Sequence, residues 1–188
     1  MKIIGITGSL ASGKTTASKI LSNRKGPLFS ADDTVKKLYK KKNLKRLISK
    51  KFKLKNTKNI KNKLKKLIFS DKSSLIKLEK IIHPFVRTEM RKFIQKYRNR
   101  KVIFLEIPLL IESNLMKNFD IIIFIKAKKQ IRLRRFISKG GDKKFFEILN
   151  DKQYSDLKKS NNCDFVVVNE KNLKILKTNL LRILSKYV

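Results

Sequence analysis

Residues 5–16 have the sequence GITGSLASGKTT. This stretch carries the spacing G-x-x-x-x-G-K-[ST], whose fixed positions are Gly8, Gly13, Lys14 and Thr15. A glycine loop of this kind binds nucleotide phosphates through its backbone N–H groups, and it needs a strand before it and a helix after it. The stretch therefore predicts a nucleotide site and the strand–loop–helix unit from which an α/β fold is built.

The flanking residues supply both elements, because residues 3–7 form a short apolar run and residues 14–23 follow a helical pattern. We expect backbone N–H groups from Ala11 to Lys14 to surround a phosphate at the start of the helix. The Lys14 ammonium would neutralise the β and γ oxygens, and the Thr15 hydroxyl would bind Mg²⁺. The loop thus predicts where a phosphoryl donor binds, but it does not identify the acceptor.

Four later apolar runs continue the pattern, at residues 28–30, 102–105, 121–125 and 165–168. Such runs, flanked by charge and separated by helical segments, are typical of buried parallel strands. Helical patterns span residues 34–97 and 171–187. We predict a wound α/β sheet in one domain, because no internal repeat and no Pro- or Ser-rich linker divides the 188 residues.

The chain is strongly basic, with a formal net charge of +35 and 39 lysines against 10 arginines. Residues 34–70 contain no acid, which leaves two interpretations open: a nucleic-acid-binding surface, or the solvent-facing sides of packed helices. The apolar residues of this region keep helical spacing, and arginine, which reads base edges, is scarce. Both observations favour packed helices, so we expect no specific nucleic-acid partner.

Other features of the sequence bear on the compartment. The longest apolar run, residues 121–125, is too short to span a bilayer, and the first residues lack the pattern of a signal peptide. The single cysteine, Cys163, cannot form an internal disulfide and is most simply a small core residue. We therefore expect a cytoplasmic protein with no membrane partner.

A pair of acids follows the run at residues 28–30, in the stretch LFSADDTVKKLY. A kinase that acts on a hydroxyl benefits from a carboxylate that accepts the hydroxyl proton, and Asp32 or Asp33 offers one. The alternative is that one of them caps the helix that follows. The residues alone leave both interpretations open.

A third stretch, VIFLEIPLLIESNL, begins at residue 102 and places Glu106 at the end of an apolar run. A carboxylate at this point typically holds Mg²⁺ through water in a nucleotide site. Pro108 is expected to end the strand and start a helix. Glu112 is then either a second polar group of the site or a solvated helix residue, and the second is the default.

The stretch QIRLRRFISKGGD groups Arg132, Arg134 and Arg135 ahead of Gly140-Gly141. Arginines beside a glycine hinge are typical of a lid that closes on a triphosphate, whereas the alternative is an exposed basic helix. Because arginine is rare in this chain, the lid is favoured. His83 is the only histidine, and no neighbouring residues form a metal set or a nucleophile pair with it.

Taken together, these stretches resemble the dephospho-CoA kinase family. The matching segments, in chain order, are GITGSLASGKTT, SADDTVKKLY, LEKIIHPFVR, FLEIPLLIES, KKQIRLRRF and CDFVVVNE, with Gln153 eleven positions before Asp164. The resemblance implies a five-stranded parallel sheet of the P-loop nucleotide-kinase type, with a helical substrate-binding region and a lid. Within a single kinase domain over residues 1–188, it implies a nucleotide-binding core of about 1–32, 101–128 and 162–188, an acceptor-binding region of about 33–100 and a lid of about 129–160.

The implied activity is transfer of the γ-phosphate of ATP to the 3′-hydroxyl of the ribose of dephospho-CoA, with Mg²⁺, in the last step of coenzyme A synthesis. The resemblance implies Asp32 as base, Lys14 and Arg135 as further catalytic groups, His83 and Glu106 beside the acceptor, and Thr15 with Glu106 at the metal. The implied ATP-binding residues are Ala11, Ser12, Gly13, Lys14, Thr15, Thr16 and Asn169.

The sequence departs from the family pattern at four positions. Ser30 and Glu106 each stand where the family has an aspartate, and Lys139 and Leu149 stand where it often has arginine. Two other functions stay open on the residues: a small P-loop kinase acting on a nucleoside or nucleoside monophosphate, and a basic nucleic-acid-binding NTPase. The oligomeric state cannot be predicted from the sequence.

Overall fold

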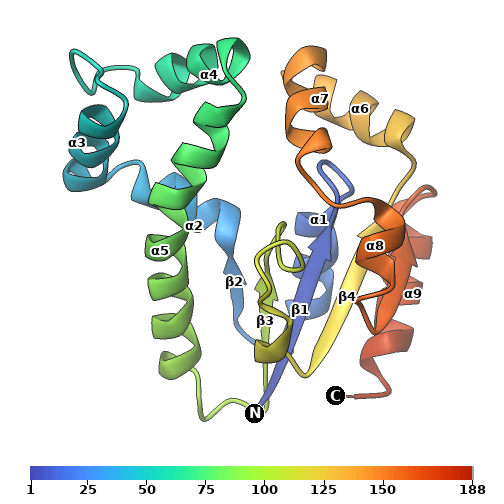
Figure 1. The fold of residues 1–188 in the computed structure, drawn as a ribbon. Coiled ribbons are helices and arrows are strands. Elements are labelled where there is room, and N and C mark those ends of the chain that lie inside the picture. Colours follow the sequence, from blue (N-terminus) through green and yellow to red (C-terminus); the bar gives the residue numbers. More distant parts are fainter. Residues whose placement is uncertain (188) are drawn as a thin grey trace. The chain divides into compact units, whose positions relative to one another are not determined.

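A computed structural model of the chain describes residues 1–187, which form two compact units. Met1–Ser30 and the chain from Ile94 onward make the first unit, and Ala31–Phe93 make the second. Figure 1 shows the elements along the chain and labels most of them. In chain order they are β1 (Lys2–Gly8), α1 (Lys14–Ser22), β2 (Leu28–Ser30), α2 (Ala31–Leu38), α3 (Lys42–Lys51), α4 (Ile60–Ser70), α5 (Ser73–Lys96), β3 (Val102–Glu106), the 3₁₀ helix η1 (Met116–Asn118), β4 (Ile121–Lys126), α6 (Lys129–Ile137), α7 (Lys143–Asp151), α8 (Asp156–Ser160), β5 (Phe165–Val168) and α9 (Leu173–Leu184).

The first unit is built on a five-stranded parallel sheet with the strand order β2-β3-β1-β4-β5. The predicted wound α/β sheet is therefore confirmed, and all five apolar runs are strands. Because the strands are parallel, their carboxyl ends lie along one edge of the sheet. That edge brings together the loop after β1, Glu106 at the end of β3 and Asn169 just after β5.

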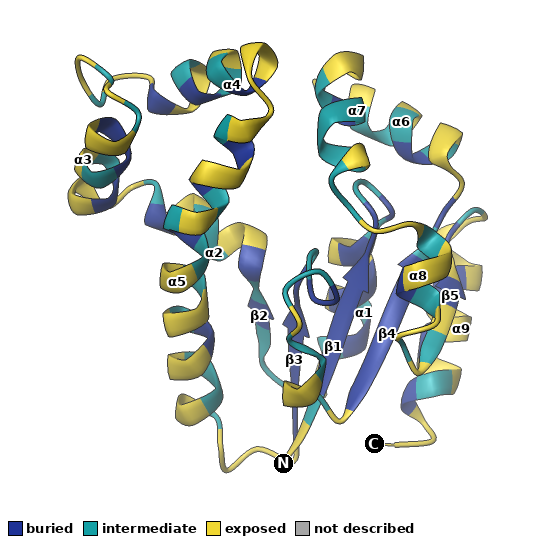
Figure 2. Cartoon of the chain, viewed as in Figure 1, coloured by how far each residue is buried: buried dark blue, intermediate teal, exposed yellow. Residues whose placement is uncertain are grey.

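Both faces of the central strands β1, β3 and β4 are covered, which explains why these strands are mostly apolar (Figure 2), whereas Val166 and Val168 of the edge strand β5 are exposed. On one face, Ile4 and Phe104 pack with Leu21 of α1 and Leu180 of α9 in a single core cluster. On the other face, a Cβ atom at Gly5 would collide with the side chains of Leu110 and Phe119. The segment after β3 therefore packs closely on β1.

That segment corrects one sequence prediction, because Pro108 does not start an α-helix. Residues 108–114 form successive turns, followed by η1. A single turn of helical hydrogen bonding forms, in which the N–H of Ser113 donates to the carbonyl of Leu109. Asn114 then takes a left-handed conformation with φ of 52°, which stops propagation of the helix. Burial of Leu110 and Ile111 fixes the segment in place of helical hydrogen bonds.

The second unit consists of the helices α2–α5, as the pattern over residues 34–97 predicted. Its apolar positions are buried at Leu44, Ile48, Ile60, Leu64 and Ile68, while most lysines of this region are exposed. The basic stretch is thus made of packed helices. Pro84 lies inside α5, although a proline there removes one backbone hydrogen bond. No helix within residues 1–187 is long and apolar enough to cross a membrane.

Candidate active site

The glycine loop joins β1 to α1 in the conformation that the spacing requires. Gly13 has φ of 96°, and a Cβ atom at this position would overlap Nδ2 of Asn169. A Cβ atom at Gly8 would overlap the carbonyl oxygen of Ile125 in the neighbouring strand. Gly8 is therefore required by close packing against a backbone carbonyl, and Gly13 by the nearby Asn169 side chain and by its left-handed φ.

Lys14 is the first residue of α1 and is only 7% exposed. Its Nζ donates a 3.0 Å hydrogen bond to the carbonyl oxygen of Ser9, so the ammonium lies over the loop. Thr15 and Thr16 follow at the exposed start of the helix. A buried ammonium and the positive end of a helix dipole at one loop form an anion-binding arrangement.

Glu106 connects the loop helix to the sheet. Its carboxylate is 1% exposed, and Oε1 accepts a 2.6 Å hydrogen bond from the Thr15 hydroxyl. Oε2 accepts a 3.2 Å bond from the hydroxyl of Ser18, one turn further along α1. The two hydroxyl bonds compensate for the loss of water around this buried carboxylate.

Ser18 is a site residue that the sequence reasoning did not identify. The signal was its spacing, because a residue three positions after Thr15 lies on the same face of a helix. Its Oγ also donates to the carbonyl of Thr15, at 3.2 Å. Ser18 therefore helps to fix the carboxylate of Glu106 beside the Thr15 hydroxyl.

Thr15 and Glu106 offer hard oxygen donors at one point, which suits Mg²⁺. This ion is commonly held by one or two carboxylates together with substrate phosphates, not by a complete protein cage. Residues 1–187 contain no cluster of three or more His, Cys, Asp or Glu side chains that could hold a metal ion. The donor set therefore fits a nucleotide-bound Mg²⁺.

Asn169 and Arg135 close the other side of the loop. Nδ2 of Asn169 donates a 2.8 Å hydrogen bond to the carbonyl of Ser12, and Asn169 is 8% exposed. Arg135, from α6, donates to the carbonyls of Ser12 at 3.3 Å and Asn169 at 3.0 Å. Two predicted ATP-site residues and the predicted lid arginine thus meet at one carbonyl group of the loop.

The three clustered arginines have three different environments. Arg135 contacts the loop and Arg134 is exposed, whereas Arg132 is 5% exposed. Nη1 of Arg132 donates to the carbonyl of Leu10 at 3.3 Å and to Oδ1 of Asn150 at 2.8 Å. Burial lowers the pKa of Arg132, and the carboxylates of Asp156 and Glu147 partly offset this shift. The group of arginines is therefore not one exposed basic helix face.

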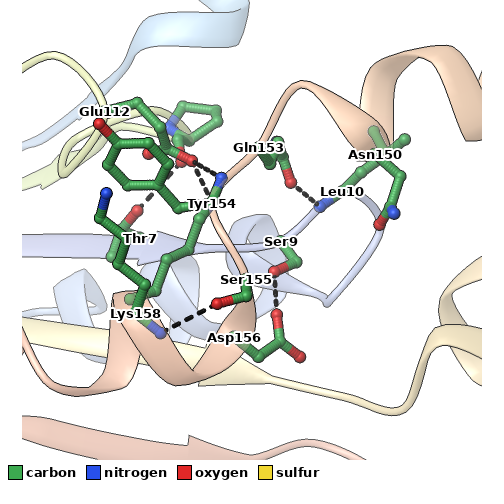
Figure 3. A network of polar contacts seen from close by, with 12 residues as sticks. Thr7, Ser9, Leu10, Glu112, Asn150, Gln153, Tyr154, Ser155, Asp156 and Lys158 are labelled. Atoms are coloured by element: carbon green, nitrogen blue, oxygen red, sulfur yellow. Dashed lines mark hydrogen bonds and ion pairs between the residues drawn. The ribbon is translucent and has the colours of Figure 1, made fainter.

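Glu112 is neither solvated nor on a helix, so the default expectation for it is wrong. Its Oε1 lies 2.8 Å from Nζ of Lys159, a residue of α8 that is fully buried. The same oxygen accepts a 3.1 Å hydrogen bond from the backbone N–H of Tyr154 (Figure 3). The ion pair ties the turns after β3 to α8, and the hydrogen bond from Tyr154 ties them to the segment that connects α7 with α8.

The predicted acceptor residues Asp32 and His83 belong to the second unit. Asp32 is exposed in the first turn of α2, which begins at Ala31, so both aspartates lie inside the helix and not before it. Neither therefore occupies the N-cap position. Asp33 pairs with Lys36 at 2.7 Å, and His83 is half-buried in α5. By register, Ser30 pairs with Glu106, and Asp32 follows two residues later.

Comparison with known proteins agrees with this geometry. The family model for dephospho-CoA kinase matches residues 2–174. A dephospho-CoA kinase from Bartonella quintana is 38% identical over 179 residues, covering 93% of this chain and 92% of that protein. The solved dephospho-CoA kinase from Campylobacter jejuni is 25% identical with a TM-score of 0.68, covering 99% and 97% of the two chains.

A more distant structure bears on the fold alone. Deoxyadenosine kinase from M. mycoides is 19% identical with a TM-score of 0.57, covering 98% of this chain and 99% of that one. It shares the wound sheet, and at this identity it carries no argument about the acceptor. The family match spans most of the chain, including the loop, Glu106 and Asn169. The chain therefore belongs to the dephospho-CoA kinase family.

Proposed function

We propose that this protein is an ATP-dependent kinase that transfers the γ-phosphate of ATP to the 3′-hydroxyl of dephospho-CoA, giving CoA and ADP. The observation that carries the proposal is the 2.6 Å contact between Thr15 and Glu106 beside a complete phosphate-binding loop, in a chain of this family. These groups make a metal–triphosphate site at the carboxyl edge of the sheet. Family membership supplies the acceptor.

On the donor side, the N–H groups of Ala11, Gly13 and Lys14 hold the phosphates. The N–H of Ser12, also expected among them, instead donates to the carbonyl of Ser9 and closes the turn of the loop. The Lys14 ammonium neutralises the β and γ oxygens, and the exposed Thr16 hydroxyl lies near the α-phosphate. Asn169 lies at the adenine side. Its amide already bonds to the loop at Ser12, so the same residue orders the loop and borders the nucleotide.

Thr15 and Glu106 would hold Mg²⁺, directly or through water. The ion would supply positive charge that offsets the charge of the nucleotide phosphates. Glu106 is one methylene longer than the aspartate of the family pattern, and it reaches the Thr15 hydroxyl with its first oxygen and Ser18 with its second. The longer side chain is thus accommodated by a serine on α1.

On the acceptor side, Asp32 accepts the proton of the 3′-hydroxyl and directs its oxygen at the γ-phosphorus. Its exposure and its position two residues after the end of β2 support this role. His83 and Glu106 border the acceptor. Arg135, on the first helix of the lid, stabilises charge on the transferring phosphoryl group when its bonds to the loop carbonyls are exchanged for phosphate oxygens.

A panel of acceptors tests the proposal. Initial rates are measured with ATP and Mg²⁺ and with equal concentrations of dephospho-CoA, deoxyadenosine, adenosine and AMP. We expect dephospho-CoA to be the preferred acceptor. Preference for a nucleoside or a nucleoside monophosphate, with dephospho-CoA inert, would instead favour the other P-loop kinase activities.

The same proposal extends to partners and compartment. We place the protein in the cytoplasm, in keeping with its single, partly buried free cysteine. We expect no specific nucleic-acid partner, because the acid-free region forms packed helices with exposed lysines. Binding to RNA that persists at physiological salt and stimulates ATP hydrolysis would contradict this expectation.

A further inference from the structure

The phosphate-binding loop contains one turn whose shape its own sequence does not favour. The N–H of Ser12 donates a 3.1 Å hydrogen bond to the carbonyl of Ser9, which closes a four-residue turn over Ser9–Ser12. Ala11, the third residue of this turn, has φ of 59°, whereas Leu10 is not among the residues with positive φ. Positive φ at the third residue alone defines a type II turn, which favours glycine there.

An alanine at this position would ordinarily favour a type I turn, in which the third residue has negative φ. The two turn types differ by rotation of the central peptide group, here the carbonyl of Leu10 and the N–H of Ala11. That rotation reverses the direction of the Ala11 N–H. The choice between the two turns therefore decides whether the Ala11 N–H, the first of the loop N–H groups expected at the phosphates, is oriented for phosphate.

Two side chains distant in sequence hold Leu10 on both of its backbone groups. Oε1 of Gln153 accepts a 2.8 Å hydrogen bond from the Leu10 N–H (Figure 3). Nη1 of Arg132 donates to the Leu10 carbonyl at 3.3 Å. The contact with Arg132 fixes the direction of the central peptide group of the turn. The contact with Gln153 fixes the peptide group before it.

The Arg132 side chain and the segment that carries Gln153 are themselves held in place. Nε of Arg132 donates to the carbonyl of Ala127 at 3.0 Å, Nη1 also bonds to Asn150, and the guanidinium lies 5.8 Å from the ring centroid of Phe146. Three residues after Gln153, the carboxylate of Asp156 accepts a hydrogen bond from Ser9 Oγ, which joins the same segment to the first residue of the turn. The two contacts to Leu10 are thus preorganised before a nucleotide arrives.

We propose that Arg132 and Gln153 are positioning residues that keep the Leu10–Ala11 peptide in its type II orientation and thereby direct the Ala11 N–H at the nucleotide phosphates. The inference rests on the proposed function only in that the loop binds a nucleotide, and it holds whatever the acceptor is. Neither side chain needs to touch the nucleotide. Both come from the segment between β4 and β5, which also supplies Arg135.

The test is a cycle of variants read by nucleotide affinity. Gln153→Met keeps the length of the side chain and removes the acceptor for the Leu10 N–H. Ala11→Gly removes the cost of positive φ, so the turn keeps its type II form without help. The matched control is Gln130→Met, because Gln130 is an exposed glutamine on α6. ADP dissociation constants come from titration calorimetry, and folding is checked by thermal unfolding.

We expect Gln153→Met to weaken ADP binding by about fivefold, the effect of one hydrogen bond, and Gln130→Met to leave it unchanged. In the Ala11→Gly background, Gln153→Met should have little effect on ADP affinity. Arg132→Lys, made in the same two backgrounds, tests the hydrogen bond to the Leu10 carbonyl. In steady state, KM for ATP should rise more than kcat falls in the Gln153→Met variant.

Unchanged ADP affinity in Gln153→Met would overturn the inference. So would an equal loss in the Ala11 and the Ala11→Gly backgrounds, since that would show a general structural role and no control of the turn. ADP binding does not depend on the acceptor, so this result is separate from any failure to form CoA. If Arg132→Lys does not fold, the Gln153 cycle alone decides the question.

Discussion

The hydroxyl of Thr15 donates a 2.6 Å hydrogen bond to Oε1 of Glu106 and so joins the start of α1 to the last residue of β3. The loop residue that the motif assigns to the metal therefore lies against the only acid at the end of that strand. The pair shows that the glutamate at this position reaches the start of α1. It also sets the first prediction.

Glu106→Gln should lower kcat/KM for Mg²⁺-ATP by about 10- to 100-fold, as is typical when a group that orients or ligates a metal is changed. The amide still accepts a hydrogen bond from Thr15 but brings no charge to the metal. Glu106→Asp should lose less, because the charge remains. Initial rates over a range of Mg²⁺ concentrations measure both. Glu89→Gln, at an exposed ion pair with Lys41, is the control. Equal rates for Glu106→Gln and the unmodified protein would remove Glu106 from the metal site.

Gly13→Ala should abolish measurable ADP binding, because the added Cβ would overlap the Asn169 amide and φ is 96°. Gly140→Ala is a matched control, since Gly140 also has positive φ, at 79°, but a Cβ there meets nothing within 4 Å. That variant should cost about 1 kcal/mol of stability and leave ADP affinity unchanged. Calorimetric titration and thermal unfolding separate the two effects. Normal ADP affinity in Gly13→Ala would contradict the loop geometry.

Asp32→Asn should lower kcat by about 100- to 10,000-fold, the usual contribution of a general base, with a small change in KM for ATP. The neighbouring Asp33 pairs with Lys36 at 2.7 Å on the surface, so Asp33→Asn should leave kcat near normal. Steady-state rates with saturating ATP give the comparison. A large loss in Asp33→Asn alone would move the base to that residue, and near-normal rates in both variants would leave neither as base.

Lys159→Met should destabilise the protein by about 3–5 kcal/mol, because it leaves the buried carboxylate of Glu112 without its cation. The double variant Lys159→Met/Glu112→Leu should recover part of this loss. Lys128→Met is the control, since Lys128 is 77% exposed and lies 3.7 Å from Glu170, where a pair contributes at most about 1 kcal/mol. Denaturant unfolding measures all three free energies. Equal losses in Lys159→Met and Lys128→Met would show that burial of the first pair has no consequence.

Cys163 should react slowly with iodoacetamide in the native protein. Burial raises the pKa of its thiol to about 12, Asp164 and Glu112 add to the shift, and Lys159 opposes it. The reactive thiolate is therefore scarce at pH 8, whereas an unfolded thiol titrates near about pH 8.5. Burial of the neutral thiol stabilises the folded protein fully below the pKa of the unfolded thiol. This stabilisation is lost as the pH rises toward 12, the pKa of the thiol in the folded protein. Alkylation followed by mass spectrometry, with and without denaturant, measures the difference, and equal rates would contradict it.

The strands were predictable because burial on both faces leaves continuous apolar runs. The runs at residues 28–30 and 165–168 coincide with β2 and β5, and the others are extended by one or two residues. Glu106 was predictable as the acid at the end of such a run. The segment after Pro108 was not, because packing of Leu110 and the left-handed Asn114 outweigh its helical pattern.

The contacts of two residues that the sequence did single out could not be predicted, because their partner is remote in the chain. Gln153 and Arg132 act on Leu10 across 143 and 122 positions, and no local pattern marks such a pair. The resemblance distinguished Arg135 from the other two arginines, but nothing in the sequence distinguished the buried Arg132 from the exposed Arg134. Ser18 lies one helical turn after Thr15, as its spacing indicates. Its contact with Glu106 could not be predicted, because the sequence does not show that the end of β3 lies beside α1.

The most direct test of the central claim is the ratio of CoA formed to ADP formed, measured by chromatography with ATP, Mg²⁺ and dephospho-CoA. We predict one CoA for each ADP, with no turnover in a Lys14→Ala variant that remains folded. ADP formed without CoA, or CoA formation that survives in Lys14→Ala, would contradict phosphoryl transfer at this loop.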